Sequence, residues 1–373
     1  MAKRNQSQIV RMTELDGLRG MASFSVFLSH VIGMFVLSDY LLKLNNSIVH
    51  IFWDGAAAVV LFFVLSGFVL TLPYINKEKK INYIQFIIRR IFRIYPAYIV
   101  AISISLFLKT YWFNPESLSG LSPWIQGFWN SSTTQLTEIL NHILMLKLNT
   151  KEINPVVWTL VIEMKISIIY PVVILIIQKI DNTKLLIAAV GMVSMMAVFI
   201  GGFLIYLPIF IFGGLLAKYY KNIIEIINTK NKMLAYLLFV VGILFYSIRY
   251  SLFGIITNEY VINMFISTGA ILLILIILAS KQMKNLFSNR IMRFFGDISY
   301  SFYLLHFPII LFTASFVYPK VNSIIVVGII SLVISILLSY IVFKFIEIPF
   351  QQIGRVISLK YEKKKNENIK KII

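Results

Sequence analysis

The chain has 373 residues, 58% of them hydrophobic, and a mean hydropathy of +0.82. This composition is too apolar for a soluble domain of that length, and it indicates a polytopic membrane protein. The net charge of +19 does not indicate a nucleic-acid partner, because the basic residues gather in short segments between apolar runs, where they set membrane topology. The absence of cysteine excludes thiol nucleophiles, and the four histidines lack metal-ligand spacing, so we expect no metal site.

Ten apolar segments are predicted to be transmembrane helices, which makes the expected fold an all-α polytopic membrane protein. In chain order they cover residues 20–37, 53–75, 91–108, 155–177, 185–200, 203–217, 233–248, 260–278, 298–317 and 324–345. Most of the 35 lysines and arginines fall in alternate connecting segments, which the positive-inside rule places in the cytoplasm. Both termini are therefore expected to be cytoplasmic, and the chain is expected in the cell membrane.

The connecting segments suggest three regions. Residues 1–14 are expected to form a cytoplasmic N-terminal segment, residues 15–350 the transmembrane domain, and residues 351–373 a frayed, basic cytoplasmic tail. Residues 110–132 carry three tryptophans and are expected outside, since tryptophan favours the interface. Residues 139–148 are apolar but too short to cross, so they are predicted to be re-entrant or interfacial.

The stretch LDGLRGMASFSVFLSH, residues 15–30, joins a charged turn to an apolar segment. On a helix, Arg19 and His30 are separated by three turns plus about 20°, so they share one face, roughly 16 Å apart along the axis. A guanidinium suits phosphate at the water interface, and a neutral imidazole suits proton transfer. We therefore expect a tunnel that lets a cofactor with a phosphate end and a long arm touch both. The alternative is that Arg19 is a flanking charge and His30 a packed helix residue.

Other polar residues are expected inside the bilayer, where a charge costs on the order of 3 kcal/mol and needs a partner or a cavity. His30, Glu163 and His306 are predicted at similar depth and could converge on one cavity; the alternative for Glu163 and His306 is structural hydrogen bonding between helices. Ser66, before Gly67, is expected mainly to serve helix packing, with a possible wall role. Arg90 and Arg93 share a helix face and are candidates to bind phosphates.

Together these stretches resemble the membrane-bound acyltransferase family 3. The resemblance rests on the Arg19-to-His30 spacing and on five further motifs in the expected order: FFVLSGF (62–68), RRIFRIYPAY (89–98), WTLVIEMKISIIYP (158–171), GDISYSFYLLHFP (296–308) and the Glu347-x-Pro349-Phe350 element. One departure is Lys165-Ile166-Ser167, which replaces the aromatic pair that often follows the glutamate. Because few residues follow the last predicted span, we expect none of the serine-hydrolase-like domain that some members append.

The resemblance implies transfer of an acyl group, usually acetyl, from cytoplasmic acyl-coenzyme A to a hydroxyl of an envelope carbohydrate or similar acceptor. It also implies that Arg19 and His30 are essential and that Arg90 and Arg93 contribute. Acetyl-coenzyme A is then a co-substrate, and no tightly bound cofactor is expected. Membrane lipids would be the surrounding partners.

The predicted mechanism has His30 as general base and Glu163 orienting the imidazole or binding sugar hydroxyls. Arg19, Arg90 and Arg93 would hold the phosphates. The walls of the substrate site are expected to include Ser66, Trp158, Tyr303 and His306. The alternative function is a transporter or flippase of lipid-linked sugars, although the chain shows neither a repeated half nor paired broken helices.

Overall fold

The computed structural model describes residues 11–36, 43, 45–75, 80–131, 133–229, 232–251 and 256–372. Helices dominate these ranges, and no strand occurs within them. Residues 1–10 of the expected N-terminal segment, the last residue of the first expected span, Leu37, and the final residue of the tail, Ile373, lie outside the described residues.

Each of the ten predicted spans coincides with a helix. These are α1 (Thr13–Ile32), α3 (Gly55–Thr71), α4 (Tyr83–Tyr111), α7 (Trp158–Lys179), α8 (Thr183–Ile200), α9 (Leu207–Thr229), α10 (Lys232–Tyr246), α12 (Glu259–Ala279), α14 (Arg290–Val321) and α15 (Ile324–Val342). Among the described residues, eight segments are long and apolar enough to cross a membrane. The other two helices are α1, whose first turns carry Glu14, Asp16 and Arg19, and α10, which has 15 residues.

Side-chain caps mark where several of these helices begin. Asp54 accepts a hydrogen bond from the backbone of Ala57 at the start of α3, and asparagines cap four others: Asn82 for α4, Asn182 for α8, Asn258 for α12 and Asn289 for α14. Short polar side chains of this kind satisfy the free N–H groups of a first helical turn. These capping residues thus mark helix starts that a hydropathy profile does not detect.

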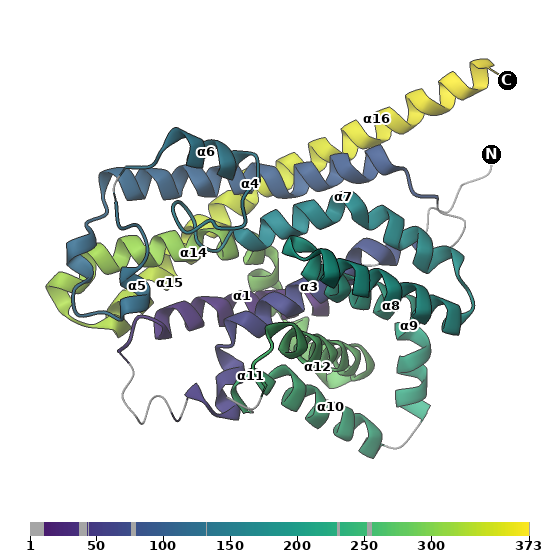
Figure 1. Ribbon diagram of the computed structural model, residues 1–373, viewed down its shortest axis with the longest axis horizontal. Coiled ribbons are helices and arrows are strands. Elements are labelled where there is room, and N and C mark those ends of the chain that lie inside the picture. The colour runs from purple at the N-terminus through teal and green to yellow at the C-terminus, as the bar shows by residue number, and fades with distance from the viewer. Residues whose placement is uncertain are drawn as a thin grey trace.

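The shorter elements connect the long helices. They are η1 (Ile48–Phe52), η2 (Leu72–Tyr74), η3 (Pro115–Leu118), α5 (Pro123–Gln126), α6 (Leu136–Ile143), η4 (Gly202–Tyr206), α11 (Ile248–Ser251), α13 (Lys281–Phe287), the π-helical segment η5 (Phe343–Glu347) and α16 (Ile348–Ile372). In Figure 1, α5 lies at one end of the molecule and the last turns of α16 extend beyond the other.

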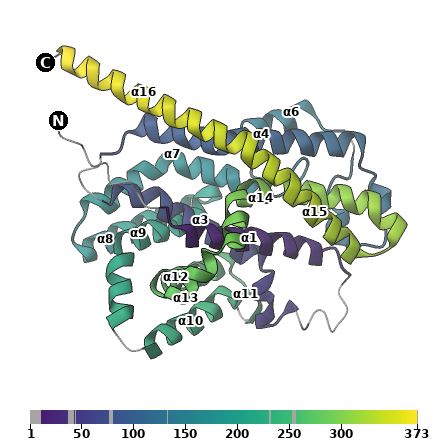
Figure 2. The ribbon, with the colours of Figure 1, turned by 180° about the vertical axis from the view of Figure 1, so that it is seen from behind.

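Two connecting segments can be compared with their predictions. Residues 139–148, predicted to be re-entrant or interfacial, overlap α6, which lies on the surface with Leu136, Leu140 and Leu144 exposed and thus agrees with the interfacial alternative. The tail predicted to be frayed is helical as far as Ile372, because α15, η5 and α16 follow one another without a break. Figure 2 shows α16 lying along α4, which it also contacts.

Glycines allow the two helices that carry the N-terminal and late motifs, α1 and α14, to approach at backbone distance. A Cβ on Gly20 would lie 2.7 Å from the backbone nitrogen of Gly296, and a Cβ on Gly296 would lie 2.5 Å from the carbonyl oxygen of Asp16. Small residues at such crossings are typical of membrane helix packing. The two glycines therefore place Asp16 and Arg19 beside the start of α14.

A similar close approach joins α3 and α9. A Cβ on Gly67 would lie within 2 Å of the carbonyl oxygen of Phe210, and one on Gly213 would come equally close to that of Val64. The packing interpretation of the Ser66-Gly67 pair is thus right for the glycine. Ser66 itself has another contact, described below.

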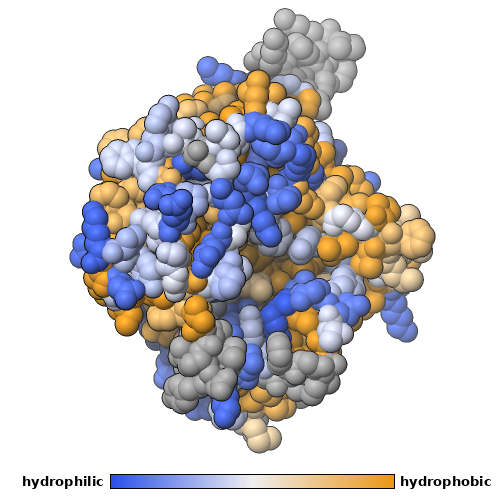
Figure 3. All heavy atoms as spheres, turned by 60° about the vertical axis from the view of Figure 1, so that its left-hand side comes forward, coloured by the Kyte–Doolittle hydropathy of each residue, from blue (hydrophilic) through white to orange (hydrophobic). Residues whose placement is uncertain are grey.

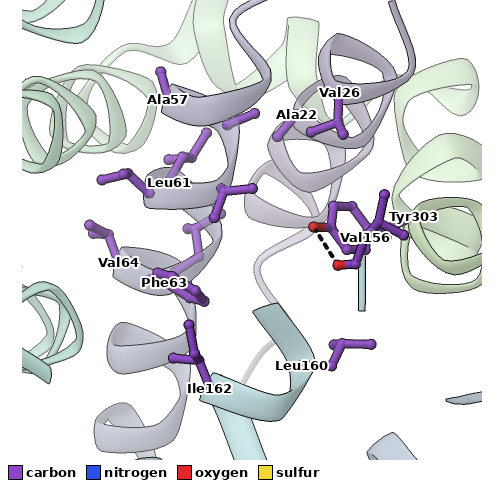
Figure 4. Packing of buried hydrophobic residues seen from close by; sticks show 14 of the residues in the cluster. Ala22, Val26, Ala57, Leu61, Phe63, Val64, Val156, Leu160, Ile162 and Tyr303 are labelled. Carbon is purple, nitrogen blue, oxygen red and sulfur yellow. Dashed lines mark hydrogen bonds between the residues drawn. The ribbon is translucent and has the colours of Figure 1, made fainter. Parts of the chain in front are cut away.

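The core consists of apolar side chains from these packed helices. Figure 4 shows Val26 of α1, Leu61 of α3, Leu160 of α7 and Tyr303 of α14 in one region, with the Tyr303 hydroxyl directed to the backbone of Val156. In the view of Figure 3, hydrophilic side chains gather over the middle of the face and many of the surrounding atoms are hydrophobic. Exposed apolar side chains are expected where a helix faces lipid rather than water.

Candidate functional site

The first of two neighbouring cavities, here named the inner cavity, has a volume of about 570 Å³ and is rich in charge. Its walls come from α1, α3, α4, α7 and α14 together with the start of α16. The charged side chains that line it are Arg11, Asp16, Arg19, Arg90, Arg93, Glu163 and Asp297. Four arginines thus face three carboxylates. The predicted phosphate ligands Arg19, Arg90 and Arg93 lie together in it, as does Ser66.

Arg90 is held by an ion pair across two helices. Its Nη2 donates to Oε1 of Glu163 at 2.5 Å, and its Nε donates to the Ser167 hydroxyl at 3.1 Å. Ser66 donates to the same Glu163 oxygen at 3.2 Å. Both members of the ion pair are mostly buried, with 14% and 19% of their side chains exposed. Glu163 therefore orients a cation of the inner cavity.

Arg93 is paired more loosely. Its Nη1 lies 3.5 Å from Oε2 of Glu347, and its side chain is 40% exposed. Glu347 is almost fully buried and accepts two hydrogen bonds from Ser301, through the backbone N–H and the hydroxyl. Arg19 has an even weaker partner, Asp16, at 3.6 Å. Arg19 and Arg93 are thus the two arginines of this set best able to exchange their partner for another anion.

The second cavity, here named the outer cavity, has a volume of about 1020 Å³ and is mainly aromatic and neutral. It is lined by His30 of α1, by residues of the connection before α3 and by the tryptophan-bearing segment after α4. Its aromatic side chains are Phe35, Trp53, Trp124, Phe128, Trp158, Tyr250, Tyr303 and Phe307. Polar groups converge among them, including Asn45, His50, Asn149, Thr150 and Lys151. Trp158, a predicted wall residue, belongs to this cavity.

His50 is one polar group of the outer cavity outside the spanning segments. Burial lowers the pKa of His50 to about 4, because removal from water disfavours the charged imidazolium. Its ring stacks on Tyr250 with centroids 3.3 Å apart. His50 is therefore neutral near pH 7 and can exchange hydrogen bonds with an uncharged ligand.

His30 is paired with the other predicted intramembrane histidine. Its Nδ1 lies 2.9 Å from Nε2 of His306, and Nδ1 of His306 lies 3.0 Å from the carbonyl oxygen of Phe302. His306 is fully buried, whereas His30 is only partly buried and lines the outer cavity. Trp124 covers the His30 ring with the two planes at 20°. The structure thus brings His30 and His306 together, as expected.

Two predictions about this region are wrong. Glu163 does not join the histidines but pairs with Arg90, because α1 begins at Thr13 rather than Gly20 and α14 at Arg290 rather than Ile298. Both histidines consequently lie further along their helices than the hydropathy boundaries implied. His306 is also not a wall residue of the substrate site, because its buried ring lines neither cavity. Arg19 and His30 line two cavities that adjoin at the shared wall residues Val59 and Tyr303, so a tunnel between them would pass these two side chains.

Tyr303 is the larger of these shared wall residues. Its hydroxyl donates toward the carbonyl oxygen of Val156 at 3.2 Å and receives a hydrogen bond from Thr159 at 3.0 Å. The side chain is only 6% exposed. Its ring thus forms part of both cavities while its hydroxyl is anchored to α7 and the turn before it, as Figure 4 shows for Val156.

Sequence reasoning missed three contributors to the site. The sequence motif identifies Glu347 only as part of a closing element, but a carboxylate within an apolar run needs a partner, and Arg93 is that partner. The tryptophan pattern predicts an interfacial position for Trp124, but in the structure it packs on His30. Asp16, within the first motif, pairs with both Arg11 and Arg19.

The structure is a bundle of helices in which an arginine-lined cavity adjoins an aromatic cavity that contains His30. These features define a multi-pass membrane protein with a candidate site for two ligands. The family model described as an acyltransferase domain matches residues 12–344, so the chain belongs to acyltransferase family 3. The match covers every lining residue of the outer cavity and every one of the inner cavity except Arg11, Ile348 and Gln351.

Curated relatives agree with this membership. The chain is 24% identical to O-acetyltransferase OatA of Staphylococcus aureus, with 91% of this chain and 57% of the relative aligned. It is 26% identical to peptidoglycan O-acetyltransferase OatA of Listeria monocytogenes, over 94% of this chain and 58% of the relative. Acyltransferase MdmB of Streptomyces mycarofaciens is 33% identical over 26% of this chain and 24% of its own. The chain thus spans less than two thirds of these relatives, and no solved structure matches it.

Proposed function

We propose that this protein is a membrane O-acetyltransferase that moves an acetyl group from cytoplasmic acetyl-coenzyme A to a hydroxyl of a cell-envelope carbohydrate. The observation that carries the proposal is the pair of adjoining cavities, one cationic and one aromatic, with His30 on the second. Two of the relatives are named O-acetyltransferases, one of them a peptidoglycan O-acetyltransferase, and this supports a sugar acceptor.

In the proposed arrangement the inner cavity receives the donor. Arg19 and Arg93 bind its phosphates, because their present carboxylate partners are 3.6 Å and 3.5 Å away and are readily exchanged. Arg90 adds positive charge while Glu163 holds its position. The pantetheine arm then passes Val59 and Tyr303, the two residues that border both cavities, and brings the thioester to His30.

The outer cavity receives the acceptor. The faces of Trp53, Trp124 and Trp158 offer electron-rich surfaces to the C–H groups of a sugar ring. Asparagine, threonine and neutral histidine side chains between them supply hydrogen bonds to hydroxyls. A few polar groups placed among aromatic walls are typical of a small-molecule site with orientation specificity.

The chemical step is a direct transfer. The hydroxyl oxygen attacks the thioester carbonyl carbon while His30 takes the hydroxyl proton; the C–O bond forms, the C–S bond breaks, and the proton passes from His30 to the leaving coenzyme A thiolate. General-base assistance of this kind contributes roughly 10²- to 10⁴-fold. The absence of cysteine from the chain favours this direct route over a thioester-linked enzyme intermediate.

The test uses purified protein in lipid nanodiscs with [14C]acetyl-coenzyme A and soluble peptidoglycan glycan fragments. The proposal expects labelled ester on the glycan with the wild-type protein, and loss of at least about 10²-fold with His30→Gln. Transfer at the wild-type rate by a folded His30→Gln protein would contradict the role of His30. No acetyl ester in nanodiscs, together with transport of a lipid-linked sugar across the membrane of proteoliposomes without acetyl-coenzyme A, would favour the transporter alternative.

A further inference from the structure

We infer that His306 is a positioning residue that fixes His30 in the tautomer with a proton on Nδ1, so that Nε2 is the atom that accepts the hydroxyl proton. This inference rests on the proposed function for its catalytic meaning. Its structural part says which of the four ring nitrogens of His306 and His30 carry protons, and this follows from the hydrogen bonds alone. The assignment begins at the carbonyl group of Phe302.

The chain of hydrogen bonds has one fixed end. The carbonyl oxygen of Phe302 can only accept, so Nδ1 of His306, 3.0 Å away, carries a proton. A neutral imidazole has a single N–H, and Nε2 of His306 therefore presents a lone pair. That lone pair faces Nδ1 of His30 at 2.9 Å, so Nδ1 of His30 must be the donor. The same rule then leaves Nε2 of His30 unprotonated.

The geometry of the two rings suits this hydrogen bond. Their planes differ by only 9° and their centroids are 5.1 Å apart, while the facing nitrogens are 2.9 Å apart. Nearly parallel rings with these two distances lie edge to edge, and the lone pair of one nitrogen points along the N–H of the other. Face-to-face stacking would instead bring the centroids closer together.

Within the part of the chain that the structure describes, Nε2 of His30 makes no competing hydrogen bond. The His30 ring lines the outer cavity and is only partly buried, whereas the His306 ring is fully buried. A base whose other nitrogen is oriented by a third group is the general arrangement of an activated proton acceptor. Here the third group is a neutral imidazole rather than a carboxylate.

The same contact favours the charged state formed during transfer. When Nε2 of His30 takes the hydroxyl proton, Nδ1 keeps its own, and the lone pair of His306 continues to accept it. A hydrogen bond from a charged donor is stronger than one from a neutral donor. The face of Trp124, whose ring is nearly parallel to that of His30, adds favourable interaction with the cation.

The N-terminal motif and the late motif are connected through this pair. Gly20 and Gly296 bring α1 and α14 to backbone contact, and His30 and His306 meet further along the same two helices. A helix interface fixed by glycines holds the two rings in register. His306 thereby acts on the acceptor proton through His30 and does not itself touch a substrate.

The test is nitrogen NMR of the protein labelled with [15N]histidine in nanodiscs, where protonated and unprotonated ring nitrogens resonate far apart. The chain has only four histidines, and the His30 signals are those lost in His30→Gln. The inference expects the wild-type His30 to be protonated at Nδ1 alone. In His306→Leu, which removes the acceptor, it expects a shift toward the Nε2-protonated form. In His306→Gln, whose amide oxygen can accept, it expects the wild-type pattern to return.

A matched control is available in His142, whose Nδ1 also lies within 2.8 Å of the carbonyl group four residues earlier, at Glu138. His142→Leu removes a buried imidazole with that same local contact and should leave the His30 signals unchanged.

Kinetics give a second measurement. His306→Leu should lower kcat by about 10²-fold without changing the KM for acetyl-coenzyme A, and His306→Gln should recover most of the lost kcat.

The outcomes separate the inference from the function on which it rests. A wild-type His30 protonated at Nε2, or a His306→Leu protein with unchanged His30 signals, overturns the inference whatever the activity. Absence of acetyl transfer in a protein with the expected tautomer overturns the proposed function and leaves the tautomer assignment standing.

Discussion

Arg90 Nη2 lies 2.5 Å from Glu163 Oε1, and this ion pair joins α4 to α7 in the wall of the inner cavity. Ser66 of α3 donates to the same carboxylate oxygen, so three helices meet at one group. A cation held in this way is oriented before any ligand arrives. The pair therefore links helix packing to the electrostatics of the proposed donor site.

The first prediction concerns this pair. Glu163→Ala should reduce stability by about 2 kcal/mol, because it leaves a mostly buried guanidinium without its counter-charge; this lies between the values for exposed and fully buried pairs. The measurement is thermal or denaturant unfolding in nanodiscs. The control is Glu138→Ala, which breaks a pair of 2.6 Å with Lys147, whose side chain is 54% exposed, and should cost about 1 kcal/mol or less. Equal losses in the two variants would count against a structural role for the inner pair.

The second prediction concerns phosphate recognition. Arg93→Ala should raise the KM for acetyl-coenzyme A by about tenfold, since a charge-assisted hydrogen bond contributes about 1.5–3 kcal/mol. Arg89 provides the control, because it belongs to the same basic cluster but its Nε donates to Ser358 of α16, and it does not line the inner cavity. Arg89→Ala should leave the KM within about twofold. A similar rise in both variants would show that general surface charge, rather than Arg93, attracts the donor.

The third prediction concerns the wall between the cavities. Tyr303→Trp enlarges the side chain that borders both cavities and should lower kcat while leaving the binding of coenzyme A, measured by calorimetry, unchanged. Tyr303→Phe keeps the ring and loses only the contacts with Thr159 and Val156, so its kcat should stay within about tenfold of wild type. Normal kcat in a folded Tyr303→Trp protein would mean that the thioester does not pass this residue.

The fourth prediction concerns the glycine contact between α1 and α14. Gly20→Ala places a Cβ 2.7 Å from backbone atoms of α14, and the helices must separate; overpacking of this kind costs about 1–3 kcal/mol. Acetyl transfer should fall together with stability, because the His30–His306 contact depends on the same interface. Gly191→Ala in α8, where an added Cβ meets nothing within 4 Å, should leave activity unchanged and should not lower stability, because alanine favours a helix more than glycine does. An active Gly20→Ala protein would show that this spacing is not needed.

Hydropathy was enough to predict the positions of ten helices, because they are apolar runs, and eight segments of the described residues are long and apolar enough to cross a membrane. It was not enough to find where α1 and α14 begin. At α1, helical hydrogen bonding already runs through the charged LDGLRG stretch, where the apolar run has not yet begun, so hydropathy predicts a start several residues too late. Because of that error, the predicted depths of His30 and His306 wrongly matched the predicted depth of Glu163.

Within the candidate site, local spacing predicted the joint placement of Arg90 and Arg93, which are three residues apart on one helix. The partners of these arginines could not be predicted in the same way. Glu163 and Glu347 come from helices far along the chain, and which carboxylate meets which arginine depends on the order in which the helices pack. The two histidines likewise meet only because α1 and α14 are neighbours.

The central claim is that the acetyl group crosses from a donor held in the inner cavity to an acceptor in the outer one, with His30 at the point of transfer. The most direct measurement uses proteoliposomes with all proteins oriented one way, [14C]acetyl-coenzyme A confined to the side of the inner cavity, and an impermeant glycan confined to the other. Labelled glycan should appear with wild-type protein and fall by at least about 10²-fold with His30→Gln. Label that appears only when donor and glycan share one side, or that persists in His30→Gln, would contradict the claim.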